Sequence, residues 1–121
     1  MVSGLRAQEL FLGDKKDNVI AILKSAGYII VDTGLTKTDN LSLIHFKKTS
    51  DFDFYEYFNQ TQVCVASAVK FNDKSALTDQ IGSLNNKYNN IGSYSWLDKD
   101  AKFKITLVID DDCFTLLYNK L

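Results

Sequence analysis

In three consecutive segments between residues 41 and 71 the side chains sort into two sets that alternate with a period of two, and this alternation limits the possible folds more than any other feature of the chain. The segments are 41–48 (LSLIHFKK), 52–58 (FDFYEYF) and 62–71 (QVCVASAVKF). Successive side chains of a β-strand point to opposite faces of a sheet, so a period of two predicts three strands. In the second segment the phenylalanines share one face, and the tyrosines, Tyr55 and Tyr57, share the other. Short polar loops join the segments, which favours antiparallel pairing.

Two further segments show the spacing of amphipathic helices. Apolar residues recur at i, i+3, i+4 and i+7 in 14–27 (DKKDNVIAILKSAG), and a similar stripe runs through 72–90 (NDKSALTDQIGSLNNKYNN). This spacing places the apolar residues on one side of a helix. Residues 91–110 (IGSYSWLDKDAKFKITLVID) predict a hairpin with its turn at 98–101. The last segment, 113–121 (CFTLLYNKL), predicts a short closing helix with its apolar residues on one side.

The order of these elements predicts an α+β fold. The order is a helix, three or four strands, a helix, two strands and a short helix; with three strands it reads α-β-β-β-α-β-β-α, and a short β-branched segment at 28–34 (YIIVDTG) is the additional strand. The apolar stripes of the helices need a sheet face to cover. We therefore expect a two-layer sandwich, in which an antiparallel sheet of about five strands has the helices mostly on one face. The 121 residues contain no proline and no low-complexity tract, so residues 1–121 are predicted to form a single domain.

The charge balance disfavours nucleic acid and membranes as partners. The net charge is −1, and Arg6 is the only arginine, although arginine is the residue best suited to phosphate and base-edge contacts. No apolar run approaches the ~20 residues that span a bilayer, and the N-terminal residues lack the pattern of a secretory signal. Cys64 and Cys113 show neither metal-binding nor disulfide spacing. We therefore expect a cytoplasmic protein with reduced thiols, and the many lysines and asparagines suggest a bacterium or a phage as its source.

Three consecutive aspartates, Asp110–Asp112, are the first candidates for chemistry. Carboxylate oxygens are the ligands that Mg²⁺ prefers, so Asp110 and Asp112 define one alternative function, a small Mg²⁺-dependent phosphoryl-transfer or nucleotide enzyme. No glycine-rich phosphate-binding loop accompanies them, however. The simpler interpretation is that a strand ends here and that Asp111 or Asp112 caps a helix beginning at Cys113. The sequence therefore favours a protein without catalytic residues, metal site or cofactor.

His45 is the only histidine of the chain and lies in the first alternating segment. A catalytic histidine needs a nucleophile and an orienting acid. No motif in the sequence supplies them, so we interpret His45 as a structural residue.

The aromatic segment 52–58 is the better candidate for a binding surface. Its tyrosines, Tyr55 and Tyr57, are predicted to point away from the core, and Tyr94 and Trp96 of the late hairpin fall beside them if the strands pair as expected. Tyrosine and tryptophan are enriched at protein interfaces, so these four are the predicted partner-binding residues. Aromatic side chains also stack on single-stranded bases, which gives a second alternative, a single-stranded nucleic-acid binder. The acidic neighbours of the tyrosines argue against it.

The order of elements and the segment from Val63 to Asp112 resemble a known fold. This fold is shared by YbjN-like proteins and the effector chaperones of type III secretion systems. In YbjN-like proteins a helix ends near an asparagine-rich stretch, which is followed by a strand, a tight acidic turn and another strand. Residues 84–112 (LNNKYNNIGSYSWLDKDAKFKITLVIDDD) are similar to this arrangement. The closing segment departs from it, because its helix is short and the corresponding part of the chaperones contributes to a dimer interface. The resemblance implies a non-enzymatic protein-binding domain.

Residues and resemblance together predict a non-enzymatic protein-interaction module, chaperone-like or regulatory. Such a module would bind a protein partner through its sheet face or its sheet edge. An uncovered face that carries Tyr55 and Tyr57 predicts a homodimer or a complex with another protein.

Overall fold

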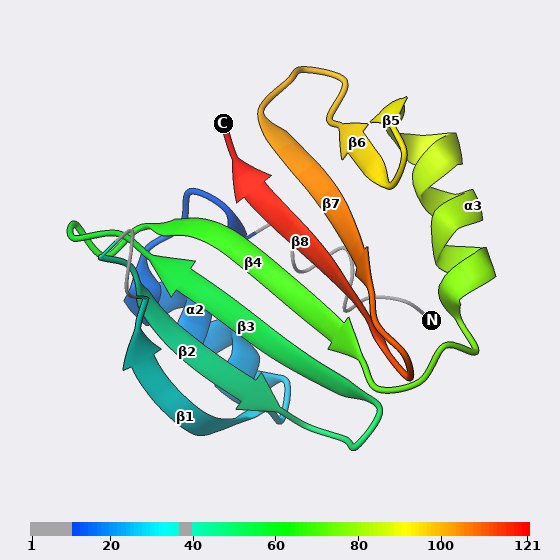
Figure 1. Cartoon of the computed structure of the whole chain (residues 1–121). Coiled ribbons are helices and arrows are strands. Elements are labelled where there is room, and N and C mark those ends of the chain that lie inside the picture. The colour runs from blue at the N-terminus through cyan, green and yellow to red at the C-terminus, as the bar shows by residue number, and fades with distance from the viewer. Residues whose placement is uncertain (1–10, 37–39) are drawn as a thin grey trace.

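The computed structural model describes residues 11–36 and 40–121, which form one antiparallel sheet of eight strands and two helices (Figure 1). In chain order the elements are α2 (Lys16–Ser25), β1 (Ile29–Leu35), β2 (Ser42–Lys47), β3 (Phe52–Phe58), β4 (Cys64–Phe71), α3 (Leu77–Lys87), β5 (Asn89–Gly92), β6 (Ser95–Leu97), β7 (Phe103–Ile109) and β8 (Phe114–Lys120). Across the sheet the strands follow the order β1-β2-β3-β4-β8-β7-β6-β5.

The sheet joins two antiparallel meanders, one formed by β1–β4 and the other by β5–β8. Antiparallel neighbours need only short turns, so each meander forms from local pairings. The two meanders meet where β8 pairs with β4 from Ala66 to Phe71. This is the long-range pairing of the fold, and it places the last strand of the chain in the middle of the sheet (Figure 1).

The predicted fold is wrong. We expected an α+β sandwich of two layers with about five strands in the order α-β-β-β-α-β-β-α, but the chain is mostly sheet and its eight strands form a single layer. Segment 113–121, expected to be a closing helix, contains β8 instead. Segment 89–97, expected to hold the end of a helix and one strand, contains the short strands β5 and β6.

Segment 113–121 misled the prediction because its apolar residues fit two periods. Phe114, Leu117 and Tyr118 have the spacing of a helical stripe. Phe114, Leu116 and Tyr118 have the spacing of one strand face, and this second set is the one that is buried. The segment pairs with β4 on one side and with β7 on the other, so its backbone groups are bonded on both sides. A short helix at the chain end would have no comparable support.

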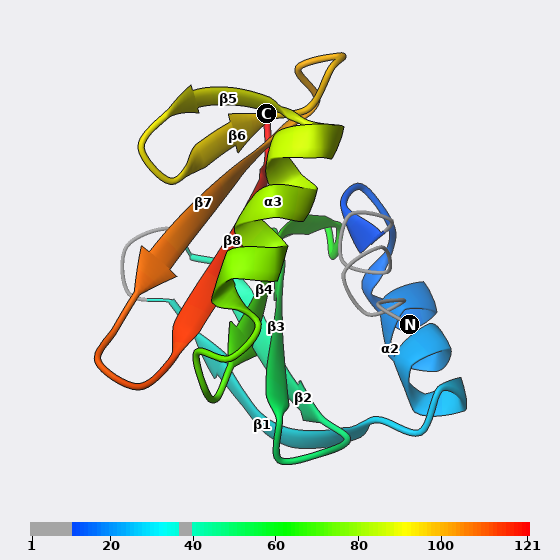
Figure 2. The same ribbon diagram turned by 90° about the vertical axis from the view of Figure 1, so that its right-hand side faces the viewer.

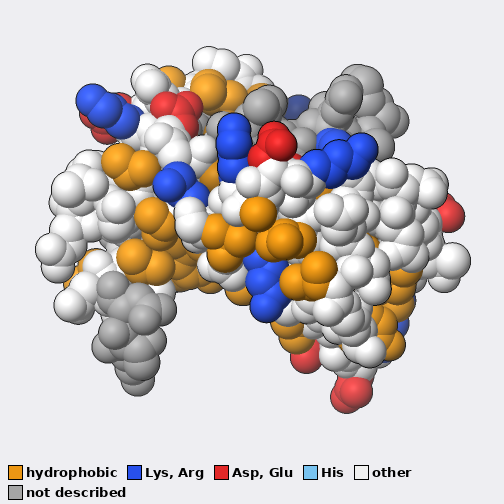
Figure 3. All heavy atoms as spheres, turned by 90° about the horizontal axis from the view of Figure 1, so that it is seen from above, with side chains coloured by type: hydrophobic (Ala, Val, Ile, Leu, Met, Phe, Trp, Pro, Cys, Tyr) orange, Lys and Arg blue, Asp and Glu red, His pale blue; other side chains and the backbone are white. Residues whose placement is uncertain are grey.

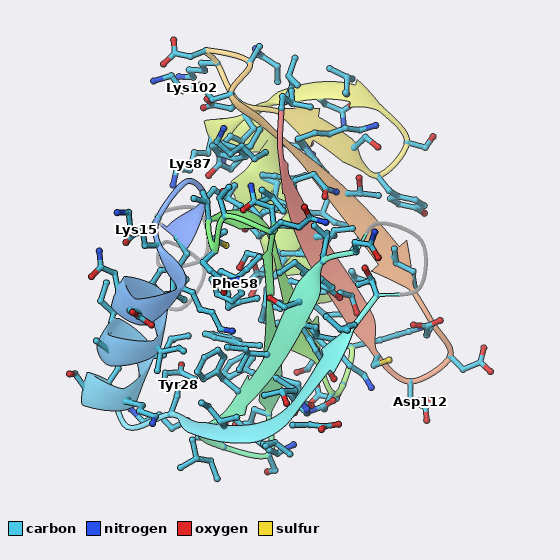
Figure 4. All side chains as sticks on the ribbon, turned by 90° about the vertical axis from the view of Figure 1, so that its left-hand side faces the viewer. Lys15, Tyr28, Phe58, Lys87, Lys102 and Asp112 are labelled. Carbon is cyan, nitrogen blue, oxygen red and sulfur yellow. The ribbon has the colours of Figure 1, made fainter. Side chains whose placement is uncertain are left out.

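The core lies on the face of the sheet that carries Phe46, Phe58 and Leu116. Buried residues of this face form one cluster with Val19 of α2 and Leu84 of α3. Figure 2 shows α2 and α3 beside the strands that they cover, and Figure 4 shows Phe58 between α2 and the sheet. The apolar stripes of the two helices are thus explained by burial against the sheet.

Neither helix in the described part of the chain is long and apolar enough to cross a bilayer. Figure 3 views the end of the molecule near the C-terminus and shows lysine, acidic and apolar side chains intermixed on that face. That end therefore presents no field of a single sign, which is the electrostatic feature of a nucleic-acid site.

Candidate functional site

The face of the sheet opposite the core carries the two tyrosines that were predicted to bind a partner. The strand register defines two rows of side chains on this face across β2, β3, β4 and β8. We call the residues of these rows the open face: Leu43, Tyr57 and Ala66 in one row, and His45, Tyr55, Ala68 and Leu117 in the next. The buried side chains of the two helices belong to the core on the other face. Neither helix therefore covers the open face.

Two alanines lie in the centre of the open face, between taller side chains. Ala66 and Ala68 are only 5% and 4% exposed. Tyr57 and Tyr55 stand opposite them on β3, and Leu117 stands opposite Ala68 on β8. These three larger side chains are themselves half-buried. The face is therefore uneven, with short side chains flanked by aromatic and aliphatic ones, and this relief suits the packing of apolar side chains from a partner.

His45 and Tyr55 form a cross-strand aromatic pair on this face. Their ring centroids are 4.4 Å apart and the ring planes differ by 16°, so one face of each ring is covered by the other ring. Burial raises the pKa of Tyr55 and of Tyr57, so both phenols are neutral hydrogen-bonding groups at physiological pH. The pair fixes the orientation of both rings before any partner arrives.

A buried carboxylate, Asp53, lies two residues before Tyr55 on β3 and holds His45 in place. Its Oδ1 accepts hydrogen bonds from His45 Nε2 at 2.8 Å and Lys47 Nζ at 2.9 Å, and its Oδ2 accepts one from Asn72 Nδ2 at 2.9 Å. Burial by itself raises the pKa of Asp53, but the bonds from Asn72, His45 and Lys47 outweigh it and lower the pKa to about 2. Asp53 is therefore ionised across the physiological range.

The Asp53 network makes a measurable prediction about stability and pH. The pKa is about 2 in the folded chain against the ordinary value of 3.8, so the carboxylate stabilises the fold above pH 3.8 and loses this effect as the pH falls toward 2. Asp53→Asn is expected to lower the free energy of unfolding by about 2 kcal/mol at neutral pH. The difference between the two proteins should shrink and vanish on acidification, as measured by urea denaturation across that range.

Asp51→Asn is the matched control for this measurement, because Asp51 lies in the same β2–β3 turn but its side chain is exposed. It should leave the free energy of unfolding unchanged within about 0.5 kcal/mol. An Asp53→Asn deficit that stays constant down to the lowest pH would show that the effect comes from packing and not from the charge.

The pairing of His45 with an orienting carboxylate was missed in the sequence. The two residues belong to neighbouring strands, and the available signal was the short β2–β3 turn, which sets Lys47 opposite Asp53 on one face. In a catalytic triad, an aspartate orients the histidine through a hydrogen bond of this kind. Among the described residues, however, His45 is hydrogen-bonded to Asp53 and stacked on Tyr55, and neither of these is a serine, threonine or cysteine nucleophile.

The three aspartates do not cap a helix, so that prediction is wrong. Asp110–Asp112 form the turn between β7 and β8, and the N–H of Asp110 donates to the carbonyl of Cys113 at 2.9 Å. Figure 4 shows Asp112 at the tip of this turn, away from α2. Within residues 11–36 and 40–121, no group of three or more histidine, cysteine or acidic side chains is arranged to hold a metal ion.

Tyr94 and Trp96 do not join the tyrosines of the open face. Tyr94 lies in the turn between β5 and β6 and is 51% exposed. Trp96 is 1% exposed, belongs to the core cluster, and donates from Nε1 to Asn85 Oδ1 of α3 at 2.8 Å. A partner therefore has no access to the indole ring in this fold, and of the four predicted residues only Tyr55 and Tyr57 lie side by side.

A second buried carboxylate, Glu56, lies on the core face of β3. It is fully buried and accepts hydrogen bonds from Ser67 Oγ at 2.9 Å and from Cys64 Sγ at 3.7 Å. Burial, followed by the nearby Glu56 charge, raises the pKa of the Cys64 thiol, which stays protonated and unreactive. A register shift beside Phe58 turns Cys64 to this face, whereas a strict alternation along β4 would put it on the same face as Ala66 and Ala68.

Comparison of the chain with protein-family models, with curated proteins and with solved structures found no match. The resemblance of residues 84–112 to YbjN-like proteins and secretion chaperones therefore stays a prediction.

Proposed function

We propose that this chain is a non-enzymatic protein-interaction module, chaperone-like or regulatory, that binds a protein partner on its open face. The observation that carries the proposal is the preorganised aromatic row, in which His45 and Tyr55 stack on each other beside Tyr57. Rigid aromatic side chains lose little conformational entropy on binding, and they supply a large contact area. The resemblance to protein-binding domains supports the same conclusion.

The geometry of the aromatic row favours protein over nucleic acid as the partner. Single-strand binders present free ring faces on which bases stack. Here the facing sides of the His45 and Tyr55 rings are already in contact, so one π-face of each ring is taken. Lys47, which follows His45 by two residues on β2, is engaged by Asp53. An apolar side chain that rests on Ala66 and Ala68 between the larger residues is a better match for this surface.

The lysines at the margin of the open face define the charge that the partner should carry. Lys70 and Lys104 lie on this side of the sheet, and neither takes part in the ion pairs found among the described residues. Carboxylates at the rim of a partner would pair with them and steer the encounter. We therefore propose a partner segment with aromatic or aliphatic side chains flanked by acidic residues, bound in the cytoplasm.

The double substitution Tyr55→Glu with Tyr57→Glu tests the proposed surface. A peptide ligand with acidic flanks is first selected on the purified wild-type chain from a displayed library, and its Kd is measured by calorimetry. Two buried carboxylates in the interface should weaken binding by about 2 kcal/mol or more, which is roughly 30-fold in Kd. The melting temperature should change little, since both side chains lie outside the core.

Tyr94→Glu serves as the control for charge and for residue type, because this tyrosine is exposed at a separate turn. It should bind the selected ligand as the wild type does. Ligands that bind the wild type and the double variant equally well would contradict the proposal. So would selections that yield only ligands whose binding Tyr94→Glu abolishes.

A further inference from the structure

His45 is the only histidine of the chain, and it lies in one row of the open face. The register shift between Ile30 and Asp32 sets Asp32 of β1 opposite it on one side, and Tyr55 of β3 lies opposite it on the other. The His45 side chain is 20% exposed. Histidine is the side chain whose charge ordinarily changes between about pH 5 and 8. A change of pH in that range therefore acts on the open face at a single histidine.

The hydrogen bond to Asp53 fixes which ring nitrogen of His45 carries the proton. Asp53 is ionised, because its pKa is lowered to about 2, so its Oδ1 can only accept a hydrogen bond. Nε2 of His45, 2.8 Å away, is then the N–H donor. In the neutral ring the other nitrogen, Nδ1, is consequently an unprotonated acceptor.

Nδ1 of His45 is accessible to a partner on the open face. Within residues 11–36 and 40–121, the only hydrogen bond of the His45 side chain is the one from Nε2. Two side-chain polar atoms in this part of the chain are buried without a hydrogen-bond partner, Ser42 Oγ and Gln80 Oε1, and Nδ1 is not one of them. Solvent therefore reaches Nδ1, and a proton or a polar group of a partner can reach it too.

Protonation of Nδ1 changes the charge of the ring and leaves its position unchanged. The Nε2–H bond to Asp53 exists in both charge states, and the stack on Tyr55 gains a cation–π contribution. The titratable and charged side chains around His45 are Asp32 on β1, Lys47 on the same strand, and Asp53, Tyr55 and Tyr57 on β3. Burial keeps the two phenols neutral, so these neighbours carry two negative charges and one positive charge. A protonated His45 brings the local sum to zero.

We propose that His45 is the specificity-determining residue of the open face and that pH selects the group it recognises. At neutral pH and above, Nδ1 accepts a hydrogen bond from an N–H or O–H of the partner segment. In mildly acidic solution Nδ1 takes a proton from water, and the ring then donates to a carboxylate of the segment. His45 belongs to the surface of the proposed function, so the inference rests on that function.

A peptide selected on the purified wild-type chain at about pH 5.5 tests the role of His45. The displayed library contains no histidine or cysteine, and the peptide is synthesised with blocked ends, so its own groups keep their charge up to about pH 8. Its Kd on the wild type, measured by calorimetry, should be about tenfold larger at pH 8, because the neutral ring no longer pairs with the carboxylate. His45→Gln cannot titrate, so its Kd should be equal at both pH values.

A matched control places a histidine elsewhere on the surface. In the His45→Gln background, Tyr94→His puts an exposed histidine in the turn between β5 and β6, away from the open face. This variant should bind the peptide equally at both pH values, as His45→Gln does. A pH dependence that returns with Tyr94→His would show a general effect of protein charge and would overturn the inference.

The tautomer of His45 is measured on the free wild-type chain, so this test does not depend on how His45→Gln folds. Nitrogen-15 magnetic resonance of the single histidine should find the proton on Nε2 at about pH 8 and on both nitrogens in acid. Asp53→Asn should give a mixture of the two neutral tautomers, because an amide can donate as well as accept. A neutral wild-type ring with its proton on Nδ1 would overturn the inference.

The remaining outcomes separate this inference from the proposed function. A peptide whose binding is lost in Tyr55→Glu with Tyr57→Glu, but whose Kd on the wild type is the same at both pH values, supports the open face and refutes the role of His45. The same holds if His45→Gln keeps the pH dependence of the wild type. Peptides that bind the double variant as well as the wild type refute the proposed function, and this inference with it.

Discussion

Removal of residues 113–121 is expected to abolish cooperative folding. These residues contain β8, which lies between β4 and β7 and joins the two meanders within the sheet. Phe114 and Leu116 are fully buried, and Tyr118 is 2% exposed. The deletion removes these side chains from the core and leaves one side of β4 and one side of β7 unpaired. The loss exceeds the ~5–15 kcal/mol that a domain of this size has in total.

The measurement is a urea titration followed by circular dichroism, together with the dispersion of amide signals in a nuclear magnetic resonance spectrum. The truncated chain should show no sigmoidal unfolding transition. Its amide signals should collapse into a narrow range. Deletion of Leu121 alone is the control, since this residue follows β8 and is 64% exposed. A truncated chain that still unfolds in one sharp transition would mean that the meander β1–β4 with α2 is stable by itself and does not need β8.

Substitution of Trp96 by alanine should cost about 3–5 kcal/mol of unfolding free energy. The indole is almost completely buried in the core cluster, and its N–H is bonded to Asn85 of α3. The change creates a large cavity and leaves the Asn85 carbonyl oxygen without this donor. Because Trp96 is the only tryptophan, unfolding is followed by circular dichroism and not by indole fluorescence.

Tyr94→Ala provides the comparison, since Tyr94 lies in the turn directly before the strand that contains Trp96. The Tyr94 side chain is half-exposed, and its substitution should change the stability by no more than about 0.5 kcal/mol. If Trp96→Ala were as mild as Tyr94→Ala, the indole would lie on the surface, and its original assignment to a partner-binding face would return.

The alternating segments allowed part of the sheet to be predicted correctly. Segments 41–48, 52–58 and 62–71 contain β2, β3 and β4. Within β3, Phe54 and Phe58 are buried in the core while the tyrosines lie on the other face. A run of alternating β-branched and aromatic residues fits a half-buried strand and little else, so local sequence was sufficient there.

The alternation failed where the strand itself is irregular. The register shift between Tyr57 and Phe58 inserts an extra residue on β4, which turns Cys64 toward the core. A bulge reverses the face of every residue on one side of it, and its position depends on the pairing with the neighbouring strand. No residue in 62–71 marks this position in the sequence.

The candidate site could be predicted only in part for a related reason. Tyr55 and Tyr57 were recognised because they lie two apart on one strand. The Asp53 network was not recognised, because its donors come from β2 and from Asn72 beyond β4. Trp96 was assigned to the wrong face, since its position depends on how β6 sits against β7 and α3.

The sequence by itself determined the elements whose side chains have a single possible period: α2, α3, β2, β3, β4 and β7. It did not determine how many strands the sheet has, or whether Phe114–Lys120 is helix or strand. That segment fits both periods, and the choice between them depends on the free backbone edges of β4 and β7, which exist only after β4 has paired with β3 and β7 with β6. Hydrogen bonds and burial gained between residues far apart in the chain outweighed a helical preference that local spacing alone could express.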